Sequence, residues 1–411
     1  MPQDPSFPTR IAFEEALAIV RRVADAHRMP VERVALPRAH GAILAHDVVA
    51  TIAQPPFDNS AMDGFALRHA DLHGEGTVLR LAGEQFAGRA LGLAIAPGEC
   101  LRITTGAPLP AGADTVVMKE NTRVDGDQVA ILVPPAHGQH VRHAGEDTRI
   151  GDVVLAAGSP LTPSRIALAA SQGLAELEVA RRPTVAVFTT GDELVEPGLP
   201  LAPGQLYNSN REQLMGLLRA EGLEPVAWPT LPDDPAAVAS ALVHAGHAFD
   251  LVITCGAVSA GEKDHIPALL QAQGEVHFWK VRMKPGMPVL FAGGSALGDA
   301  LFLCLPGNPV SVLATFLALG RPLLDRLQGR APASRPRWRA HLAAPWRKAH
   351  ERLEFLRGRL RQDADGRLEV EPNPADGSHR MRAAADSDAL IMLAEGARDY
   401  PAGALVEVLP Y

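Results

Sequence analysis

Carboxylates and hydroxyls gather in short polar stretches of this sequence, apart from its apolar runs. The stretch FDNSAMDGFAL (57–67) holds Asp58 and Asp63 five positions apart and follows Pro55 and Pro56. Neither a 3.6-residue nor a two-residue apolar rhythm runs through it, so we expect a polar loop. Turn-capping aspartates are the ordinary explanation of such a stretch. A functional role for these carboxylates requires other polar segments of the chain that bind a ligand together with them.

Three polar, glycine-bearing turns each follow an apolar run in the second half of the chain. TTGDELVEPG follows PTVAVF, CGAVSAGEKDH follows DLVIT, and LPGNPVS follows ALFLC and leads into a predicted helix. Ligands of open α/β sheets bind outside the carboxyl ends of the strands, and helix N-termini attract anions. We therefore expect the turns to form one site. The first two turns contribute Thr189, Thr190, Gly191, Asp192, Glu193, Gly256, Ser259, Gly261, Glu262 and Asp264.

The segment WKVRMKPGMP, between the second and third turns, carries three cations. Lys280, Arg282 and Lys284 alternate along an extended run, which predicts that all three side chains lie on one face of a strand. Such a face either is solvated or meets an anion, and the spacing alone favours neither.

Several common enzyme classes lack their motifs in this sequence. It contains no Walker A motif, GxGxxG, HExxH or GxSxG, and its histidines show no metal-ligand spacing. The polar residues that are present offer oxygen ligands, because carboxylates stand beside turns of the kind that bind phosphate. Mg²⁺ is usually held by carboxylates together with phosphate groups. Further candidates in the first half are Asp58, Asp63, Thr104, Thr105, Glu120 and Asp147.

Size and composition predict a globular protein of two to four domains. The chain has 411 residues, of which 47% are apolar and 21% charged. A formal charge of −8 argues against nucleic-acid binding, and an anionic substrate would need a local basic pocket. Three widely spaced cysteines indicate a reducing compartment. With neither a signal-peptide pattern nor a run of about 18 apolar residues, we expect a cytoplasmic protein without membrane contact.

Helical and β patterns alternate along the chain. Residues 11–28 carry apolar side chains at helical spacing, and short β-rich runs with an Asp125–Gly126 hairpin signal fill 74–140. A helix is predicted from Pro163, with Thr162 as its cap and Gly173 after its end.

From residue 183 strands alternate with helices, which predicts a largely parallel sheet covered on both faces. PVLFA and ALFLCLPG are candidates for a hairpin, and Asn308 and Pro309 for the start of the next helix. After about residue 330 short β runs return, which favours a small barrel or sandwich.

Taken in order, these stretches resemble one family. PPFDNSAMDGFAL, RITTGAPLP, VVMKEN, AGEDTRIGD, LTPSRIALAASQG, TTGDELVEPG, YNSN, CGAVSAGEKDH, FWKVRMKPGMP and LPGNPVSV are similar to motifs of the MoeA family of molybdopterin molybdenumtransferases, which is related to the E domain of gephyrin. The resemblance runs from the first helix to about residue 320, and GSHRM and DALIMLAEG fit more loosely.

The resemblance implies a homodimer with a three-layer α/β domain of the molybdopterin-binding type, an inserted small β domain and a C-terminal β barrel. The implied domains are 1–50 with 141–180 (helical and extended), 51–140 (inserted β), 181–328 (α/β) and 329–411 (barrel). The implied reaction replaces the adenylyl group of adenylylated molybdopterin with molybdenum from molybdate and releases AMP, with Mg²⁺ as cofactor. Implied partners are a molybdopterin adenylyltransferase and molybdoenzyme maturation factors.

The family pattern also implies roles for individual residues. The expected catalytic residues are Asp58, Thr105, Asp147, Glu193 and Asp264, with Glu193 and Asp264 also as metal ligands. The expected substrate-binding residues are Thr190, Gly191, Asp233, Asp234, Gly256, Ser259, Gly261, Lys280, Lys284, Pro306, Pro309, Arg352 and Ser378.

Three positions depart from the family pattern. Ala257 stands where the family usually has a second glycine, Met287 replaces a lysine thought to help hold molybdate, and Phe65 replaces a tyrosine. Two alternatives to the molybdenum transfer stay open. One is a molybdopterin adenylyltransferase of the same fold, and the other is a gephyrin-like scaffold without activity.

Overall fold

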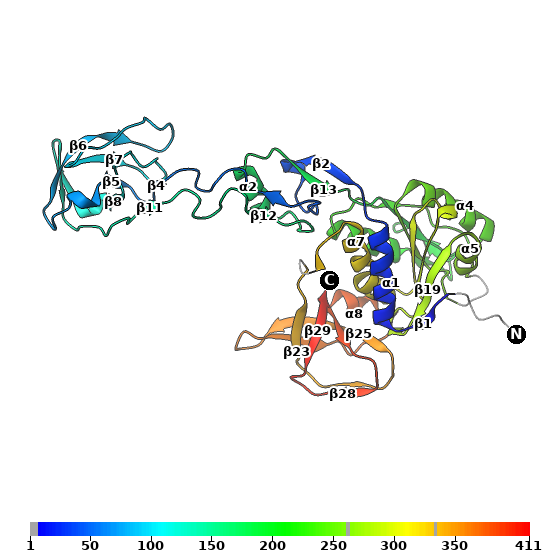
Figure 1. The fold of residues 1–411 in the computed structure, drawn as a ribbon. Coiled ribbons are helices and arrows are strands. Elements are labelled where there is room, and N and C mark those ends of the chain that lie inside the picture. The colour runs from blue at the N-terminus through cyan, green and yellow to red at the C-terminus, as the bar shows by residue number, and fades with distance from the viewer. Residues whose placement is uncertain (1–6, 260–263, 333–334) are drawn as a thin grey trace. The chain divides into compact units, whose positions relative to one another are not determined.

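The computed structural model describes residues 7–259, 264–332 and 335–411 (Figure 1). The chain divides into two compact units. The first unit comprises Met1–His46, Ala157–Pro163 and Glu176–Tyr411, and the second comprises Asp47–Ala156 and Ser164–Ala175. Within the described residues, no helix combines the length and apolar character that a membrane crossing requires.

A seven-stranded sheet forms the centre of the first unit. Its strands, in spatial order, are β1 (Thr9–Ile11), β19 (Glu275–Val281), β21 (Leu290–Gly293), β22 (Leu301–Leu305), β18 (Leu251–Cys255), β14 (Val185–Thr189) and β17 (Val226–Ala227). The last four are mutually parallel, whereas β21 runs antiparallel to both its neighbours. The largely parallel sheet and the hairpin of β21 with β22 confirm the sequence-based predictions.

Helices cover both faces of this sheet because its strands are apolar on both sides. In β14, Val185 and Val187 join a core with α1 (Phe13–Ala26), while Ala186 and Phe188 join a core with α4 (Pro235–Ala248). The α1 side also holds α3 (Ser209–Ala220), α6 (Pro309–Thr315), a π-helical turn at Phe316–Gly320, and α7 (Arg321–Leu327). Figure 1 shows α7 beside α1. The α4 side also holds α5 (Ile266–Gln273).

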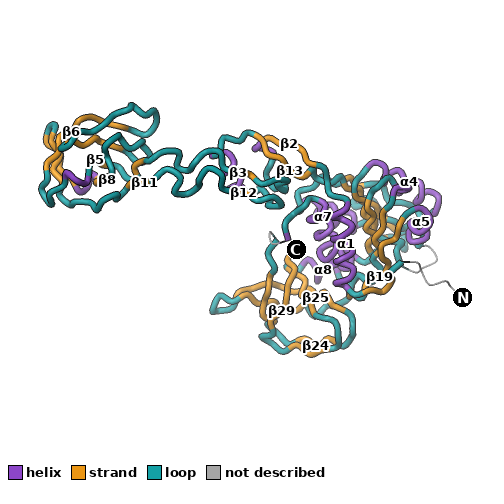
Figure 2. The backbone as a smooth tube through the Cα atoms, in the orientation of Figure 1, coloured by secondary structure: helices purple, strands orange, loops and turns teal. Residues whose placement is uncertain are grey.

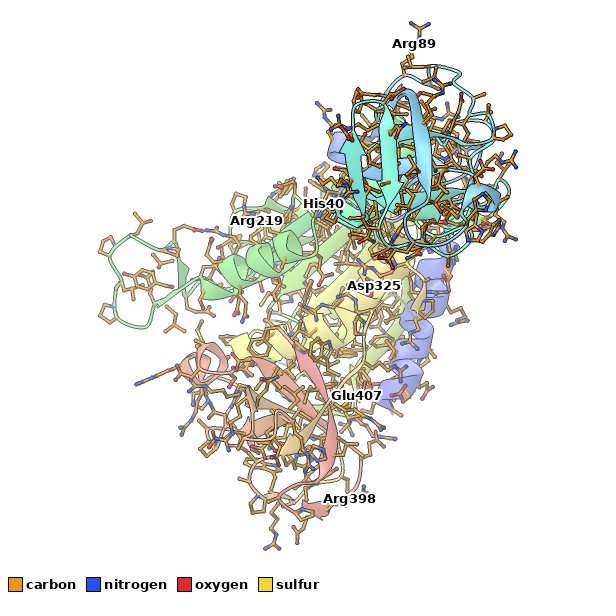
Figure 3. The ribbon with its side chains drawn as sticks, turned by 90° about the vertical axis from the view of Figure 1, so that its left-hand side faces the viewer. His40, Arg89, Arg219, Asp325, Arg398 and Glu407 are labelled. Atoms are coloured by element: carbon orange, nitrogen blue, oxygen red, sulfur yellow. The ribbon has the colours of Figure 1, made fainter. Side chains whose placement is uncertain are left out.

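A closed barrel follows, as predicted. The strands β25 (Leu353–Gln362), β26 (Leu368–Pro372), β23 (Trp338–Leu342), β29 (Leu405–Pro410) and β27 (Ala389–Leu393) pair in this order, and β27 pairs back with β25. β20 (Met283–Lys284) adds to β25, β24 (Trp346–Lys348) pairs with β28 (Arg398–Tyr400), and α8 (Met381–Ala385) precedes β27. Figure 3 shows Arg398 and Glu407 on this barrel and Arg219 on α3.

The second unit consists mainly of strands and loops (Figure 2). Its six-stranded sheet has the order β8 (Thr115–Met118), β5 (Gly64–Leu67), β7 (Glu99–Ile103), β6 (Val78–Gln85), β10 (Gln128–Ile131) and β9 (Thr122–Asp125). β4 (Asn59–Ser60) pairs with β11 (Val141–Arg142), and β3 (Val48–Val49) with β12 (Val153–Leu155). The predicted hairpin joins β9 to β10.

Smaller elements complete the two units. They are α2 (Pro163–Ser171), β2 (Val31–Ala35) paired with β13 (Glu176–Ala180), β15 (Leu194–Val195) paired with β16 (Leu206–Tyr207), and 3₁₀ turns at Leu36–Arg38, His69–Asp71, Lys119–Asn121 and Ser295–Leu297.

The prediction that residues 57–67 form one polar loop is wrong. Asn59–Ser60 pairs as β4, and Gly64–Leu67 forms β5 between β7 and β8. All four residues of β5 are buried, so it shows no two-residue alternation. A Cβ on Gly64 would lie 1.8 Å from the Val117 carbonyl oxygen, so only glycine fits there.

Candidate active site

The three predicted turns meet at one edge of the sheet of the first unit. β14, β18 and β22 are adjacent and parallel, so their carboxyl ends lie side by side. Beyond them lies a pocket of about 370 Å³. Its lining residues are Thr190, Gly191, Glu193, Leu194, Asn210, Asp233, Cys255, Gly256, Ala257, Val258, Ser259, Asp264, Pro288, Pro306, Gly307 and Asn308.

Glycines let the turns approach one another closely. Gly256 has a φ of +101°, and a Cβ there would lie 2.7 Å from the Thr190 hydroxyl oxygen. A Cβ on Gly307 would lie 3.8 Å from the Gly256 Cα. Gly191, with a φ of +139°, stands against the Glu193 carboxylate, which a Cβ would meet at 2.5 Å. Side chains at Gly191 and Gly256 would therefore change the pocket wall.

Two asparagines at the start of α3, the cap residue Asn208 and Asn210 in its first turn, tie the turns together. The buried Asn208 amide donates to the hydroxyl oxygens of Thr189 (2.7 Å) and Thr230 (3.0 Å), and its oxygen accepts the Arg211 N–H (3.3 Å). The Asn210 amide donates to the Gly307 carbonyl oxygen over 2.7 Å. Sequence reasoning gave these residues no role, although YNSN stands at a helix start directly before the apolar positions of α3.

The second turn is fixed from both sides. The indole N–H of Trp279 donates to the Val258 carbonyl oxygen (3.0 Å), and the Cys255 thiol donates to the Pro306 carbonyl oxygen (3.3 Å). Burial raises the pKa of Cys255 to about 12, so its thiol stays protonated and has no nucleophilic thiolate form at neutral pH.

Most residues expected at this sheet edge line the pocket. They are Thr190, Gly191, Glu193, Asp233, Gly256, Ser259, Asp264 and Pro306. Asp234 instead caps α4, where its carboxylate accepts the Ala236 N–H over 3.0 Å. Pro309 is the first residue of α6, and Gly261 lies outside the described residues.

The prediction that three cations share one strand face is wrong. Lys280 has a φ of +69°, which breaks the strand alternation, and its ammonium lies 4.2 Å from the centre of the Trp279 ring. Arg282 pairs with Glu395 over 3.2 Å. Lys284 belongs to β20 in the barrel sheet, so its partners come from the barrel.

Arg352 and Ser378 contact the segments that flank the pocket. The Arg352 guanidinium lies 4.0 Å from the Met287 sulfur, next to the lining residue Pro288. The Ser378 carbonyl oxygen accepts the Val310 N–H over 3.2 Å. That N–H of the first turn of α6 is therefore already bonded within the protein.

Asp58, Thr105 and Asp147 belong to the second unit, where three segments (54–63, 104–108 and 140–148, here called the loop cluster) meet. Two of these segments contain the short paired strands β4 and β11. Asp58 accepts the Ala144 N–H (2.7 Å) and lies 3.5 Å from the His143 imidazole. Asp147 donates its N–H to the Gln54 carbonyl oxygen over 3.0 Å.

Asp63 accepts both the N–H and the hydroxyl of Thr105, over 2.8 and 2.9 Å. These two bonds, the N–H first, hold the pKa of Asp63 below its ordinary value. The loop cluster thus joins Thr105 to Asp63, a carboxylate outside the set of expected catalytic residues.

Comparison with known proteins assigns the chain to a class. Residues 186–326 match a family model described as a probable molybdopterin binding domain, so the pocket lies in a domain of this class. Residues 11–173 match the MoeA N-terminal region (domain I and II), and residues 339–411 match the MoeA C-terminal region (domain IV). The chain belongs to the MoeA family, as its motifs predicted.

Individual relatives agree over nearly the full length. The molybdopterin molybdenumtransferase of Haemophilus influenzae is 40% identical over 382 residues, which cover 92% of this chain and 94% of that one. Molybdopterin molybdenumtransferase 2 of Mycobacterium tuberculosis is 39% identical, with 91% and 94% covered. The crystal structure of the molybdopterin biosynthesis MoeA protein of Pyrococcus horikoshii superposes with a TM-score of 0.82 at 27% identity and covers 98% and 100%.

Proposed function

We propose that this chain is a transferase that inserts molybdenum from molybdate into adenylylated molybdopterin and releases AMP. The observation that carries the proposal is the convergence of three turns into one pocket within the molybdopterin-binding-type domain of a MoeA family chain. The names of the relatives, at 34 to 40% identity over most of the chain, support the same reaction.

The pocket fits a hard divalent cation such as Mg²⁺. Glu193 and Asp264 supply carboxylate oxygens from two neighbouring turns. Among the described residues, no three histidine, cysteine or acidic side chains gather closely enough to hold a metal alone. This suits Mg²⁺, which commonly binds one or two carboxylates together with substrate phosphates. Bound there, the ion would neutralise charge on the phosphoanhydride that breaks.

The remaining residues would bind and orient the substrates. The glycine-bearing turns let phosphate oxygens come close to backbone N–H groups, and Ser259 adds a hydroxyl. Lys280, Lys284 and Arg352 are proposed contacts of molybdate, a tetrahedral dianion. The position of Arg352 beside Met287 supports this role, because it puts a cation next to the place where the family lysine is missing. We extend the catalytic role to Asp58, Thr105 and Asp147 from the family pattern.

Further features are proposed on the same basis. They are a cytoplasmic homodimer, a molybdopterin adenylyltransferase as the source of the substrate, and molybdoenzyme maturation factors as recipients of the product. The adenylyltransferase alternative predicts that ATP and molybdopterin accumulate adenylylated molybdopterin, whereas the proposed enzyme consumes it. A scaffold without activity would do neither.

Substitution of Asp264 tests the proposal. We expect Asp264→Ala to reduce molybdate-dependent AMP release from adenylylated molybdopterin by at least about 100-fold, as for other groups that stabilise charge in a transition state. Asp365→Ala is the matched control, because it removes the same charge at an exposed barrel turn. Unchanged AMP release in the Asp264 variant would overturn the assigned role.

A further inference from the structure

The ammonium group of Lys284 lies between two carboxylates of very different exposure. Its nitrogen is 3.0 Å from a Glu354 oxygen and 3.2 Å from an Asp376 oxygen. The Glu354 side chain is 4% exposed, and the Asp376 side chain is 53% exposed. One cation therefore faces one buried and one solvated anion.

This arrangement opposes the binding of an external anion. Two carboxylates around one ammonium leave a local excess of negative charge, which repels a dianion. Burial alone would lower the pKa of Lys284, yet Glu354 and then Asp376 outweigh it and raise that pKa. Lys284 is thus a firmly charged cation whose partners are already inside the protein. An incoming anion must replace one of them.

Glu354 is fixed in place. It stands opposite Lys284 in the parallel pairing of β25 with β20, and its second oxygen lies 3.4 Å from the His350 imidazole. Removing this buried carboxylate from its partners would leave an uncompensated charge inside the protein, which is strongly unfavourable. Glu354 is accordingly the permanent partner of Lys284.

Asp376 differs because only its side chain has to move. The buried Arg357 guanidinium donates to the carbonyl oxygens of Ala375 and Gly377, which holds the backbone on both sides of Asp376. The Asn373 side chain accepts the Ala375 N–H over 3.0 Å. With the backbone fixed, a rotation of the exposed Asp376 side chain is enough to release Lys284.

The exchange would take place close to the pocket. The Ser378 carbonyl oxygen bonds the Val310 N–H, two residues beyond the lining residue Asn308. Asp376 and Ser378 are two residues apart, so their Cα atoms are separated by at most about 7 Å. Asp376 is therefore linked to Lys284 through its carboxylate and, through Ser378, to the helix start that follows the third turn.

We propose that Asp376 is an internal counter-ion that an anionic substrate displaces from Lys284, and that this exchange sets the affinity of the site for molybdate. The inference deepens the proposed function and rests on it for the identity of the anion. Asp376 then acts as a built-in competitor, occupying the place at Lys284 that the anion takes.

Binding of molybdate alone to the full chain, measured by calorimetry, tests the inference. We expect Asp376→Asn to lower the Kd for molybdate about 2- to 5-fold, the range that one exposed ion pair provides. Asp386→Asn is the matched control. The Asp386 side chain is also 53% exposed, but it pairs with Arg382 on α8. The Kd of the Asp386→Asn variant for molybdate should therefore stay at the wild-type value.

Two further variants separate the counter-ion from a general charge effect. Lys284→Met should abolish the gain from Asp376→Asn, because the competitor then has no cation to cover. Glu354→Gln should not reproduce this gain although it also removes a negative charge, because Glu354 holds Lys284 in place and is not the partner that the anion displaces. Folding of this variant is verified by thermal unfolding. The inference is overturned if Asp376→Asn leaves the Kd unchanged, or if it tightens binding equally without Lys284.

The same measurement distinguishes this inference from the proposed function. It uses neither molybdopterin nor AMP release, so an absent transferase activity would refute the function and leave the exchange at Lys284 testable. If neither the wild-type chain nor Asp376→Asn binds molybdate, the inference fails. If only Asp376→Asn binds, the inference is supported.

Discussion

The pocket of the first unit and the loop cluster of the second unit use the same residue types differently. In the pocket, the sheet and the asparagines Asn208 and Asn210 hold most of the turns, one carboxylate, that of Asp192, accepts the Asp233 N–H over 3.1 Å, and the carboxylates of Glu193 and Asp264 belong to the lining. In the loop cluster the carboxylates themselves fix the backbone of neighbouring segments. Asp58 accepts a backbone N–H, and Asp63 accepts one together with a hydroxyl.

This difference shows why residue type alone does not assign a role. A carboxylate after a buried parallel strand has a position that the sheet determines. A carboxylate in an irregular loop takes whatever donor the fold brings near it. The partner of Asp63 is 42 positions away, and that of Asp58 is 86 positions away. The comparison predicts that variants of the pocket turns disturb packing, whereas variants of the loop cluster disturb local hydrogen bonds.

The largest effect is expected for Gly256→Ala. The new Cβ would stand 2.7 Å from the Thr190 hydroxyl and 3.0 Å from the Thr190 carbonyl oxygen, at a φ that L-residues rarely adopt. A strained backbone and a forced shift of a neighbour together cost about 1–3 kcal/mol of stability. We expect a lower Tm and a loss of AMP release, because the first and second turns separate.

Gly307→Ala is the control for that variant. It adds the same methyl group to the third turn, where the Gly256 Cα, 3.8 Å away, is its nearest contact. Ordinary van der Waals contact costs little, so its Tm should stay close to that of the wild type. Equal destabilisation by the two alanines would contradict the view that the turns are fitted to each other at Gly256.

A smaller and more local effect is expected for Asp63→Asn. The N–H and hydroxyl of Thr105 favour the ionised carboxylate, so the folded-state pKa of Asp63 lies below its ordinary value of 3.8. Its stabilising contribution is therefore complete above that ordinary value and is lost as the pH falls through the lower folded-state pKa. Hydrogen exchange at the Thr105 amide should be faster in the variant at neutral pH, and the difference should vanish in acid.

Asp147→Asn is the control, since it removes the same charge from the same loop cluster without touching the bond to Thr105. The Thr105 amide should exchange in this variant as in the wild type at every pH. If both variants accelerate exchange equally, net charge rather than the Asp63 bond protects Thr105, and the comparison between the two regions loses its basis.

The sequence predicted the pocket better than it predicted the cations and the loop cluster. Uninterrupted apolar runs identified β14, β18 and β22, and their order put Glu193 and Gly256 on one edge. The two-residue alternation predicted for the cations does not hold at Lys280, because this residue has a left-handed backbone conformation that changes the direction of the side chains. No local signal could show that Lys284 is paired with Glu354 and Asp376, because those partners come from a barrel that closes about 70 to 90 residues later.

The smallest effect is expected for Ala257→Gly, which restores the glycine usual in the family pattern. Ala257 has a φ of +50°, in the left-handed region that costs alanine about 1 kcal/mol relative to glycine. Glycine would relieve this strain in the folded state, but it would also give the unfolded chain more freedom, which costs a similar 0.4–1 kcal/mol. We therefore expect a change in stability of less than about 0.5 kcal/mol, with AMP release unchanged, measured by Tm and by the same assay. A gain of more than about 1 kcal/mol would mean that the turn stores further strain around Ala257, and that the pocket is held partly against the preference of its own backbone.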